Sequence, residues 1–187
     1  MRLIRVYPDS SVFSEPHRKA PGKTRLTIVS HGYRHRLGVP RIKMDGRFYD
    51  PQQIARFIPA WTLITSLYSV RLIACYSADP DSNNKYTQHW GEELDRSSSF
   101  GSQLSRHLKN VYVRAYAGNL VTSRPDDEAM WNYFMVGGEK AFAYVSNQCF
   151  RIFKNEPDYH CVVFFNGEIV KERYSIQAVS ELGLVRV

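Results

Sequence analysis

The segment that decides the fold reads RLTIVSHG over residues 25–32. Its first five residues are rich in β-branched and aliphatic side chains, which favour a buried strand. The run passes directly into His31 and Gly32. A second run of the same kind, Val70–Ala74, ends on Cys75. Two predicted strands therefore each end on a side chain that can take part in acid–base or nucleophilic chemistry.

Helical patterns separate these strands from each other and from a third, Val111–Tyr116. Residues 50–53, Asp-Pro-Gln-Gln, combine an N-cap aspartate, a proline at N1 and a glutamine at N3, which together predict a helix start. Pro59 predicts that this helix ends or kinks there. The serines at 97–99 can cap a second helix. The order strand–helix–strand–helix–strand predicts an α/β fold with a mainly parallel sheet flanked by helices.

Further strands are expected at both ends of the chain. Residues 2–7 alternate in polarity and predict a first strand, whereas the prolines between Pro8 and Lys23 predict a loop. Asp45-Gly46 and Asn166-Gly167 predict hairpin turns, because a type I′ turn needs positive φ at both central residues. The last third predicts a C-terminal antiparallel β-flap over residues 140–175, with strands at 141–145, 149–153, 159–165 and 169–174.

Composition predicts a single domain over residues 1–187, with 43% hydrophobic residues available for a core. No apolar run approaches the roughly 18–20 residues that cross a bilayer, so a soluble protein without a membrane span is expected. The three cysteines are too scattered to predict a disulfide framework or a metal site. The net charge of +7 favours an anionic partner, although many basic proteins are merely basic.

His31 and Cys75 are candidates for a catalytic pair. Functional groups collect at the carboxyl ends of parallel strands, and neighbouring strands lie about 4.8 Å apart. A thiolate can attack a carbonyl while an imidazole protonates the leaving amine. Gly32 lacks a Cβ, so its N–H can approach a substrate carbonyl and, with the N–H of Cys75, form an oxyanion hole. The plain alternative is a core cysteine and a histidine in a turn.

Residues 26–32 and 71–75 resemble the two catalytic strands of the caspase-like (clan CD) cysteine peptidases. The similarity is closer to the inositol-hexakisphosphate-activated self-cleaving domain of RTX toxins and related secreted bacterial effectors. It spans about residues 24–116, the catalytic α/β core of such a domain. Ala74 stands where the toxin domains tend to have glycine, but caspases have alanine there. The resemblance implies a caspase-like three-layer sandwich, with His31 as general acid/base and Cys75 as nucleophile.

The resemblance also implies an activator, inositol hexakisphosphate, held by a basic patch beside the C-terminal flap, and no metal. Arginine and lysine side chains on adjacent strands suit clustered phosphates. A solvated basic face is the alternative reading for each of these residues. The candidates in the matching stretch are Lys140, Arg151, Lys154, Lys171 and Arg173.

The leading hypothesis is therefore a cysteine endopeptidase that cleaves itself or a target protein. Its partners would be a protein or peptide substrate and an inositol polyphosphate. The resemblance implies a secreted bacterial effector or toxin that acts in a host cytoplasm. Two alternatives stay open: a non-catalytic polyphosphate-binding module of the same fold, and a nucleic-acid-binding protein. Nucleic acid is the less favoured partner, because most aromatic residues fall at the strand and helix periods of a packed core.

Overall fold

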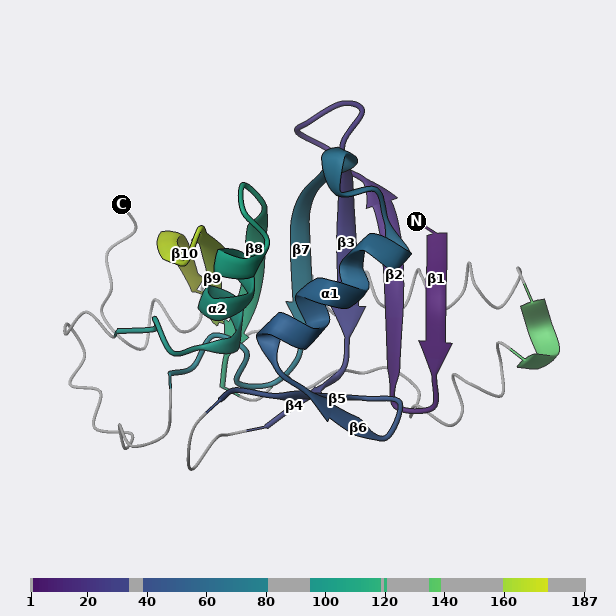
Figure 1. Ribbon diagram of the computed structural model, residues 1–187, viewed down its shortest axis with the longest axis horizontal. Helices are drawn as coiled ribbons and strands as arrows, with labels where there is room; N and C mark the ends of the chain where they lie inside the picture. Colours follow the sequence, from purple (N-terminus) through teal and green to yellow (C-terminus); the bar gives the residue numbers. More distant parts are fainter. Residues whose placement is uncertain are drawn as a thin grey trace.

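A computed structural model of the chain describes residues 2–33, 39–80, 95–118, 120, 135–138 and 160–174. Within these residues, seven strands form one sheet in the order β1-β2-β3-β7-β8-β9-β10 (Figure 1). These strands are β1 (Arg2–Tyr7), β2 (Ser10–Pro16), β3 (Thr24–Val29), β7 (Leu67–Ile73), β8 (Tyr112–Ala117), β9 (His160–Phe165) and β10 (Glu168–Tyr174).

The centre of this sheet is parallel and its flanks are antiparallel. β3, β7 and β8 run parallel to one another, whereas β1, β2, β9 and β10 pair antiparallel with their neighbours. The predicted α/β class and parallel centre are confirmed, but the whole sheet is mixed rather than mainly parallel. The C-terminal hairpin accounts for part of the difference, because β9 continues the central sheet beside β8.

The helices α1 (Pro51–Trp61) and α2 (Phe100–His107) cover one face of the parallel strands (Figure 1). Both crossovers step in the same direction, from β3 to β7 and from β7 to β8. Right-handed crossovers in one direction place their helices on the same face, and α1 and α2 contact each other there. A short 3₁₀ helix, η1 (Ile64–Ser66), leads from α1 into β7.

The predicted start of α1 is confirmed by its capping box. The Asp50 carboxylate accepts from the Gln53 N–H at 2.7 Å, and the Gln53 side-chain oxygen accepts from the Asp50 N–H at 2.9 Å. Of the predicted end or kink at Pro59, the end is wrong, because α1 runs on through Pro59 to Trp61. Pro59 removes only the hydrogen bond that its own N–H would donate, and the Thr62 N–H still donates to the Ile58 carbonyl at 3.0 Å, so the last turn is kept.

β2 is a strand where the sequence predicted a loop. The prolines that suggested the loop lie outside the strand interior, with Pro8 in the tight turn after β1 and Pro16 at the last position of β2. Val12 and Phe13, between them, are fully buried. β2 pairs with both β1 and β3, so burial and pairing on two sides outweigh its serine-rich composition.

Both predicted hairpin turns are confirmed by their backbone angles. Asp45 and Gly46 have φ of 52° and 71°, and Asn166 and Gly167 have φ of 52° and 95°. In the first hairpin, the Asp9 carboxylate accepts from the N–H groups of Asp45 and Gly46 at 2.6 and 2.9 Å. Among the described residues, this hairpin joins a three-stranded sheet of β4 (His31–Gly32), β5 (Ile42–Met44) and β6 (Arg47–Tyr49).

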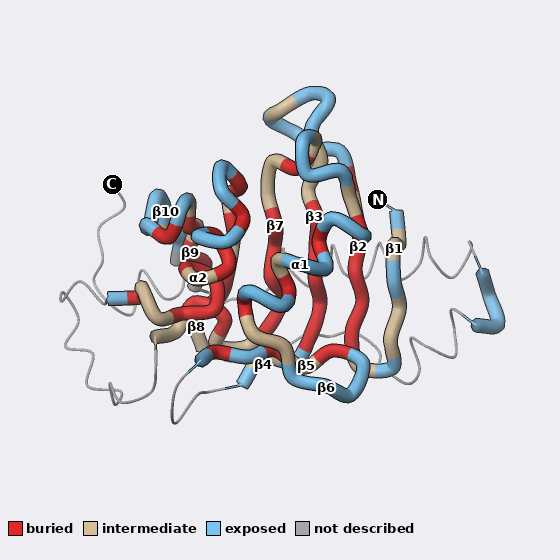
Figure 2. Tube along the Cα trace, in the orientation of Figure 1, coloured by how far each residue is buried: buried red, intermediate tan, exposed pale blue. Residues whose placement is uncertain are grey.

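The main hydrophobic core lies between the sheet and the two helices (Figure 2). Alternate residues of the central strands, such as Leu26, Ile28, Val70 and Leu72, are fully buried there. The opposite face of the sheet carries a smaller apolar cluster near the carboxyl ends of the parallel strands and charged residues nearer their amino ends. This cluster consists of Phe13, Val29 and Ile73, with Leu3 and Leu120 packed against it.

Of the β-flap predicted over residues 140–175, the structure describes residues 160–174. Residues 160–174 form β9 and β10, as expected for the last hairpin. The strands predicted at 141–145 and 149–153 lie outside the described residues. Within the described part of the chain, no helix is long and apolar enough to cross a membrane.

Candidate active site and basic pocket

His31 and Cys75 follow neighbouring parallel strands, as predicted. Val29 of β3 pairs with Ile73 of β7, and the Ser30 N–H donates to the Ile73 carbonyl at 3.0 Å. Ala74 packs in the core under the helices, so the next residue, Cys75, lies on the opposite face of the sheet. His31 is exposed at the start of β4, two residues after β3 ends, and belongs to a second sheet.

Gly32 brings the histidine strand against the main chain of Cys75. A Cβ at this position would overlap the carbonyl oxygen of Cys75 and lie 2.8 and 2.9 Å from its C and N atoms. Real Cβ atoms do not approach backbone atoms so closely, so only glycine fits here. The hydroxyl of Ser30 donates to the Lys43 carbonyl at 2.8 Å and fixes the bend between β3 and β4.

The sulfur of Cys75 contacts the main chain of Leu120. The Leu120 N–H donates to Sγ at 3.2 Å, and Sγ lies 3.7 Å from the Leu120 carbonyl oxygen. A backbone N–H aimed at sulfur stabilises negative charge on a thiolate. Burial raises the pKa of the Cys161 thiol to about 11, so this thiol stays protonated near neutral pH. Cys149 lies outside the described residues.

The turn after Cys75 is held by the end of β8. Tyr76 has φ of 56°, in the left-handed region that residues other than glycine rarely adopt. Its N–H donates to the Gly118 carbonyl at 2.7 Å, and the Ala78 N–H donates to the Tyr116 carbonyl at 2.9 Å. These bonds fix the backbone that follows the sulfur, which is the condition for a positioned nucleophile.

Arg96 ties this turn to β10. Its side chain is 3% exposed, and Nη1 donates to the Ala78 carbonyl at 2.8 Å and contacts Asp79 at 3.4 Å. Its Nε donates to Glu172 at 3.2 Å. Asp79 in turn accepts from the Gly118 N–H at 2.9 Å. Sequence reasoning missed Arg96, because a single arginine in a polar stretch carries no pattern that predicts burial.

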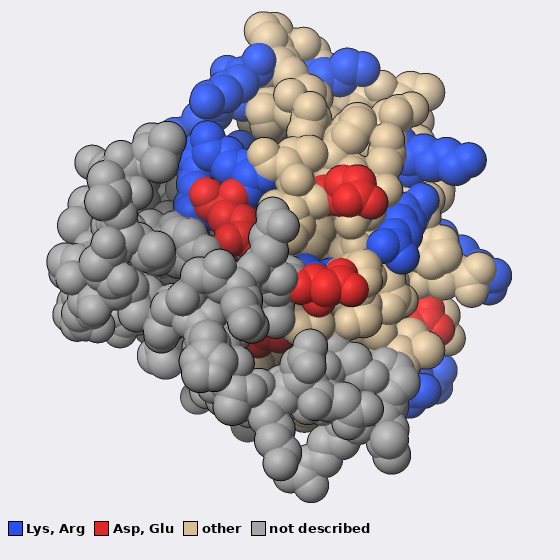
Figure 3. Space-filling view, turned by 90° about the vertical axis from the view of Figure 1, so that its left-hand side faces the viewer, with Lys and Arg blue, Asp and Glu red and all other residues tan. Residues whose placement is uncertain are grey.

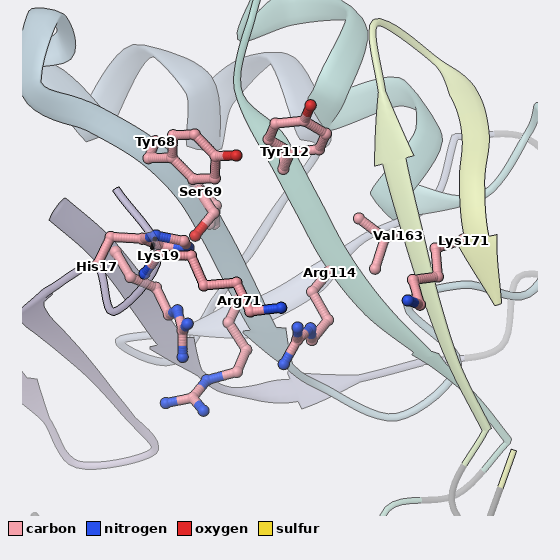
Figure 4. A pocket seen from close by; sticks show the side chains of 11 residues that line it. His17, Lys19, Tyr68, Ser69, Arg71, Tyr112, Arg114, Val163 and Lys171 are labelled. Atoms are coloured by element: carbon pink, nitrogen blue, oxygen red, sulfur yellow. Dashed lines mark hydrogen bonds between the residues drawn. The ribbon is translucent and has the colours of Figure 1, made fainter. Parts of the chain in front are cut away.

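A basic pocket occupies the same face of the sheet, at the amino ends of the parallel strands (Figure 4). Its volume is about 170 Å³. The view onto the β10 side of the molecule shows lysine and arginine side chains gathered in its upper left part (Figure 3). The cationic residues that line the pocket, together with His17, are Lys19, Arg25, Arg71, Arg114 and Lys171.

Strand register brings these cations together. Arg71 pairs with Arg114, Arg114 with Val163, and Val163 with Lys171, so one row across β7 to β10 carries three positive charges. Arg25 lies on the same face in the neighbouring row, where it pairs with Ser69, two residues before Arg71. Each arginine alternates with buried apolar residues along its strand, a pattern that indicates which face it occupies but not which residues it meets across the sheet.

A carboxylate pairs with two of the cations of the pocket. Glu15 pairs with Arg25 at 3.2 Å and with Arg71 at 3.4 Å. The pKa of Arg25 is lowered, first by burial and then by repulsion from Arg71. The pKa of His17 is also lowered, by burial and then by Arg25. Cations that crowd one another in this way favour a bound anion.

Aromatic rings line the outer edge of the pocket. The ring centroids of His17 and Tyr68 are 4.2 Å apart, those of Tyr68 and Tyr112 are 5.1 Å apart, and those of Tyr112 and Phe165 are 4.6 Å apart. Tyr68 enters this row through a bulge in β7, since Thr24 pairs with Leu67 and the next residue of β3 pairs with Ser69.

Of the five residues predicted to hold an activator, the structure describes two, and one of these lines the pocket. Lys171 lines the pocket. Arg173 lies two residues along β10, opposite Cys161, and is on the same face but does not line the pocket. Lys140, Arg151 and Lys154 lie outside the described residues.

Comparisons with protein-family models, with curated proteins and with solved structures gave no match. In the described part of the chain, no group of three or more histidine, cysteine, aspartate or glutamate side chains is arranged to hold a metal ion.

Proposed function

We propose that this protein is a cysteine endopeptidase that uses a dyad of His31 and Cys75. The observation that carries the proposal is the close approach of Gly32, in β4, to the main chain of Cys75, just after β7. It brings the strand that carries His31 against the backbone of Cys75. The exposure of His31 and the partial exposure of Cys75 leave both residues accessible to a substrate.

The proposed reaction proceeds in two steps. The Cys75 thiolate attacks the carbonyl carbon of a peptide bond, and the C–N bond breaks as His31 gives its proton to the leaving amine. Neutral His31 then takes a proton from water, whose oxygen attacks the thioester; the acid product leaves and the Cys75 thiolate is restored beside protonated His31. The Leu120 N–H supports the first step, because it is placed to stabilise the thiolate.

We further propose that a compact polyphosphate such as inositol hexakisphosphate binds the basic pocket and activates the enzyme. Arg71 lies in β7, and Cys75 follows the end of that strand by two residues, so the two are at most about 13 Å apart along the chain at about 3.3 Å per residue. The apolar cluster around Ile73 fills the space between them. An anion that draws Arg71, Arg114 and Lys171 together would therefore act on the strand that carries the nucleophile.

Mass spectrometry of cleavage fragments tests the proposed activity. The purified protein is incubated alone or with a candidate target protein, with and without inositol hexakisphosphate. We expect fragments from the wild type and from the control variant Cys161→Ala, and none from Cys75→Ala or His31→Ala. Fragments that persist unchanged in Cys75→Ala would overturn the peptidase proposal.

A second candidate function is a non-catalytic binding module for polyphosphate or single-stranded nucleic acid. The row of aromatic rings beside the cations of the pocket favours it, because bases stack on aromatic side chains while arginine and lysine contact the backbone. Thermal unfolding distinguishes the ligands. A ligand at 100 times its Kd stabilises the folded state by about 2.7 kcal/mol. A shift with an oligonucleotide, with none from inositol hexakisphosphate, would favour nucleic acid.

A further inference from the structure

The sheet formed by β4, β5 and β6 presents His31 on an exposed face together with aromatic side chains. His31 pairs with Lys43, and Lys43 pairs with Phe48, so these three residues form one row across the sheet. The adjacent row is Gly32, Ile42 and Tyr49, in which Ile42 is only 1% exposed, so that row faces the core. Tyr33 follows His31 by two residues and lies on the exposed side.

Tyr33 and Phe48 form an aromatic pair that is half open to solvent. Their ring centroids are 5.1 Å apart with an interplanar angle of 70°. Tyr33 is 42% exposed and Phe48 is 49% exposed. Aromatic residues bury about 150–250 Å² each when covered, so the pair leaves on the order of 200 Å² open. A protein–protein interface needs about 800 Å² from each partner, so this surface fits a single side chain.

The place of this pair relative to the proposed dyad identifies that side chain. In the proposed reaction His31 protonates the leaving amine, so the substrate chain on the His31 side is the one that follows the scissile bond. Tyr33 is two residues from His31 along the strand, about 7 Å, and Phe48 is two strands away, about 10 Å. An extended substrate spans these distances with two to three residues.

We propose that Tyr33 and Phe48 form a subsite for an aromatic or large aliphatic side chain, two or three residues after the scissile bond. This inference rests on the proposed peptidase function and adds a substrate preference to it. Lys43, between His31 and Phe48, is 3.8 Å from the Asp9 carboxylate. The Lys43 charge is therefore paired with Asp9, and the rings of Tyr33 and Phe48 provide the apolar surface for a substrate side chain.

Cleavage of a proteome-derived peptide library tests the subsite. Sequencing the products by mass spectrometry reads the residues on both sides of each cleaved bond. We expect the wild type to enrich large apolar residues at the second or third position after the bond. Phe48→Ala and the double variant Tyr33→Ala/Phe48→Ala should lose that enrichment and keep the preference before the bond. Leu63→Ala is the matched control, because Leu63 is 75% exposed and lies outside this sheet.

A peptide methyl ester provides the second readout, because its leaving group is methanol and no residue follows the bond. We expect the double variant to lose about tenfold in kcat/KM on a library-derived peptide and to match the wild type on the ester. A preference that persists in the double variant, or equal losses on both substrates, would overturn the subsite alone. A wild type that cleaves neither peptide nor ester would overturn the proposed function, and the subsite with it.

Discussion

At the scale of single residues, Gly32 has the least room for a Cβ among the glycines that the structure describes. A Cβ there would meet backbone atoms of Cys75, which no rotamer change relieves. We predict that Gly32→Ala destabilises the fold by about 1–3 kcal/mol and abolishes cleavage. Gly46→Ala is the comparison, since Gly46 has positive φ but open space around its Cβ position. Urea unfolding measures both, and equal, small losses in the two variants would contradict the close contact.

Cys161 gives a pH-dependent prediction. Burial raises the pKa of its thiol from 9.0 to about 11. The unfolded chain therefore loses this proton first, between pH about 9 and 11, and folding stability falls as pH rises through that window. Cys161→Ala should show a smaller fall than the wild type in urea unfolding at pH 8 and pH 11. Identical pH dependence in the two proteins would show that Cys161 titrates normally.

At the scale of elements, Arg96 is the link between β10 and the turn after Cys75. Arg96→Ala leaves Asp79 and Glu172 without their guanidinium partner, and we expect it to cost about 3 kcal/mol. Glu172→Gln should cost about 1 kcal/mol or less, because Glu172 is partly exposed and its charge is screened. Arg96→Ala should also change the rate at which iodoacetamide alkylates Cys75. An unchanged rate would limit Arg96 to a structural role.

The elements that could be predicted from sequence are those that a few adjacent residues encode. Asp45-Gly46 specifies its turn through backbone conformation, and Asp50 with Gln53 specifies a helix start through reciprocal hydrogen bonds. β2 could not be predicted in this way, since its burial depends on β1 and β3 rather than on its own composition. Pro8 and Pro16 misled the interpretation because they flank the strand.

The candidate sites also differ in how far local sequence patterns predict them. The strand ends at His31 and Cys75 could be placed from sequence, because consecutive parallel strands are usually neighbours. The row of Arg71, Arg114 and Lys171 could not, because it depends on the register of four strands, which no local pattern specifies. The aromatic row beside it depends, in addition, on a bulge in β7.

At the scale of the whole molecule, the face of the sheet away from the helices carries the basic pocket at the amino ends of the parallel strands, and Cys75 follows the carboxyl end of β7. We predict that Arg114→Gln weakens binding of inositol hexakisphosphate about tenfold, since it removes charge-assisted hydrogen bonds in the pocket. Arg56→Gln is the control, because Arg56 is exposed on α1 across the sheet. Isothermal titration calorimetry measures both, and equal affinities would place the ligand elsewhere.

The central claim is that Cys75 is a nucleophile served by His31. Its most direct test is acid quenching of the protein during turnover of a peptide methyl ester, followed by mass spectrometry of the intact chain and its digest. The account predicts an acyl group on Cys75 in the wild type, with methanol released. It predicts none in Cys75→Ala and slower formation in His31→Ala. Ester turnover that continues in Cys75→Ala, or an acyl group on another residue, would contradict it.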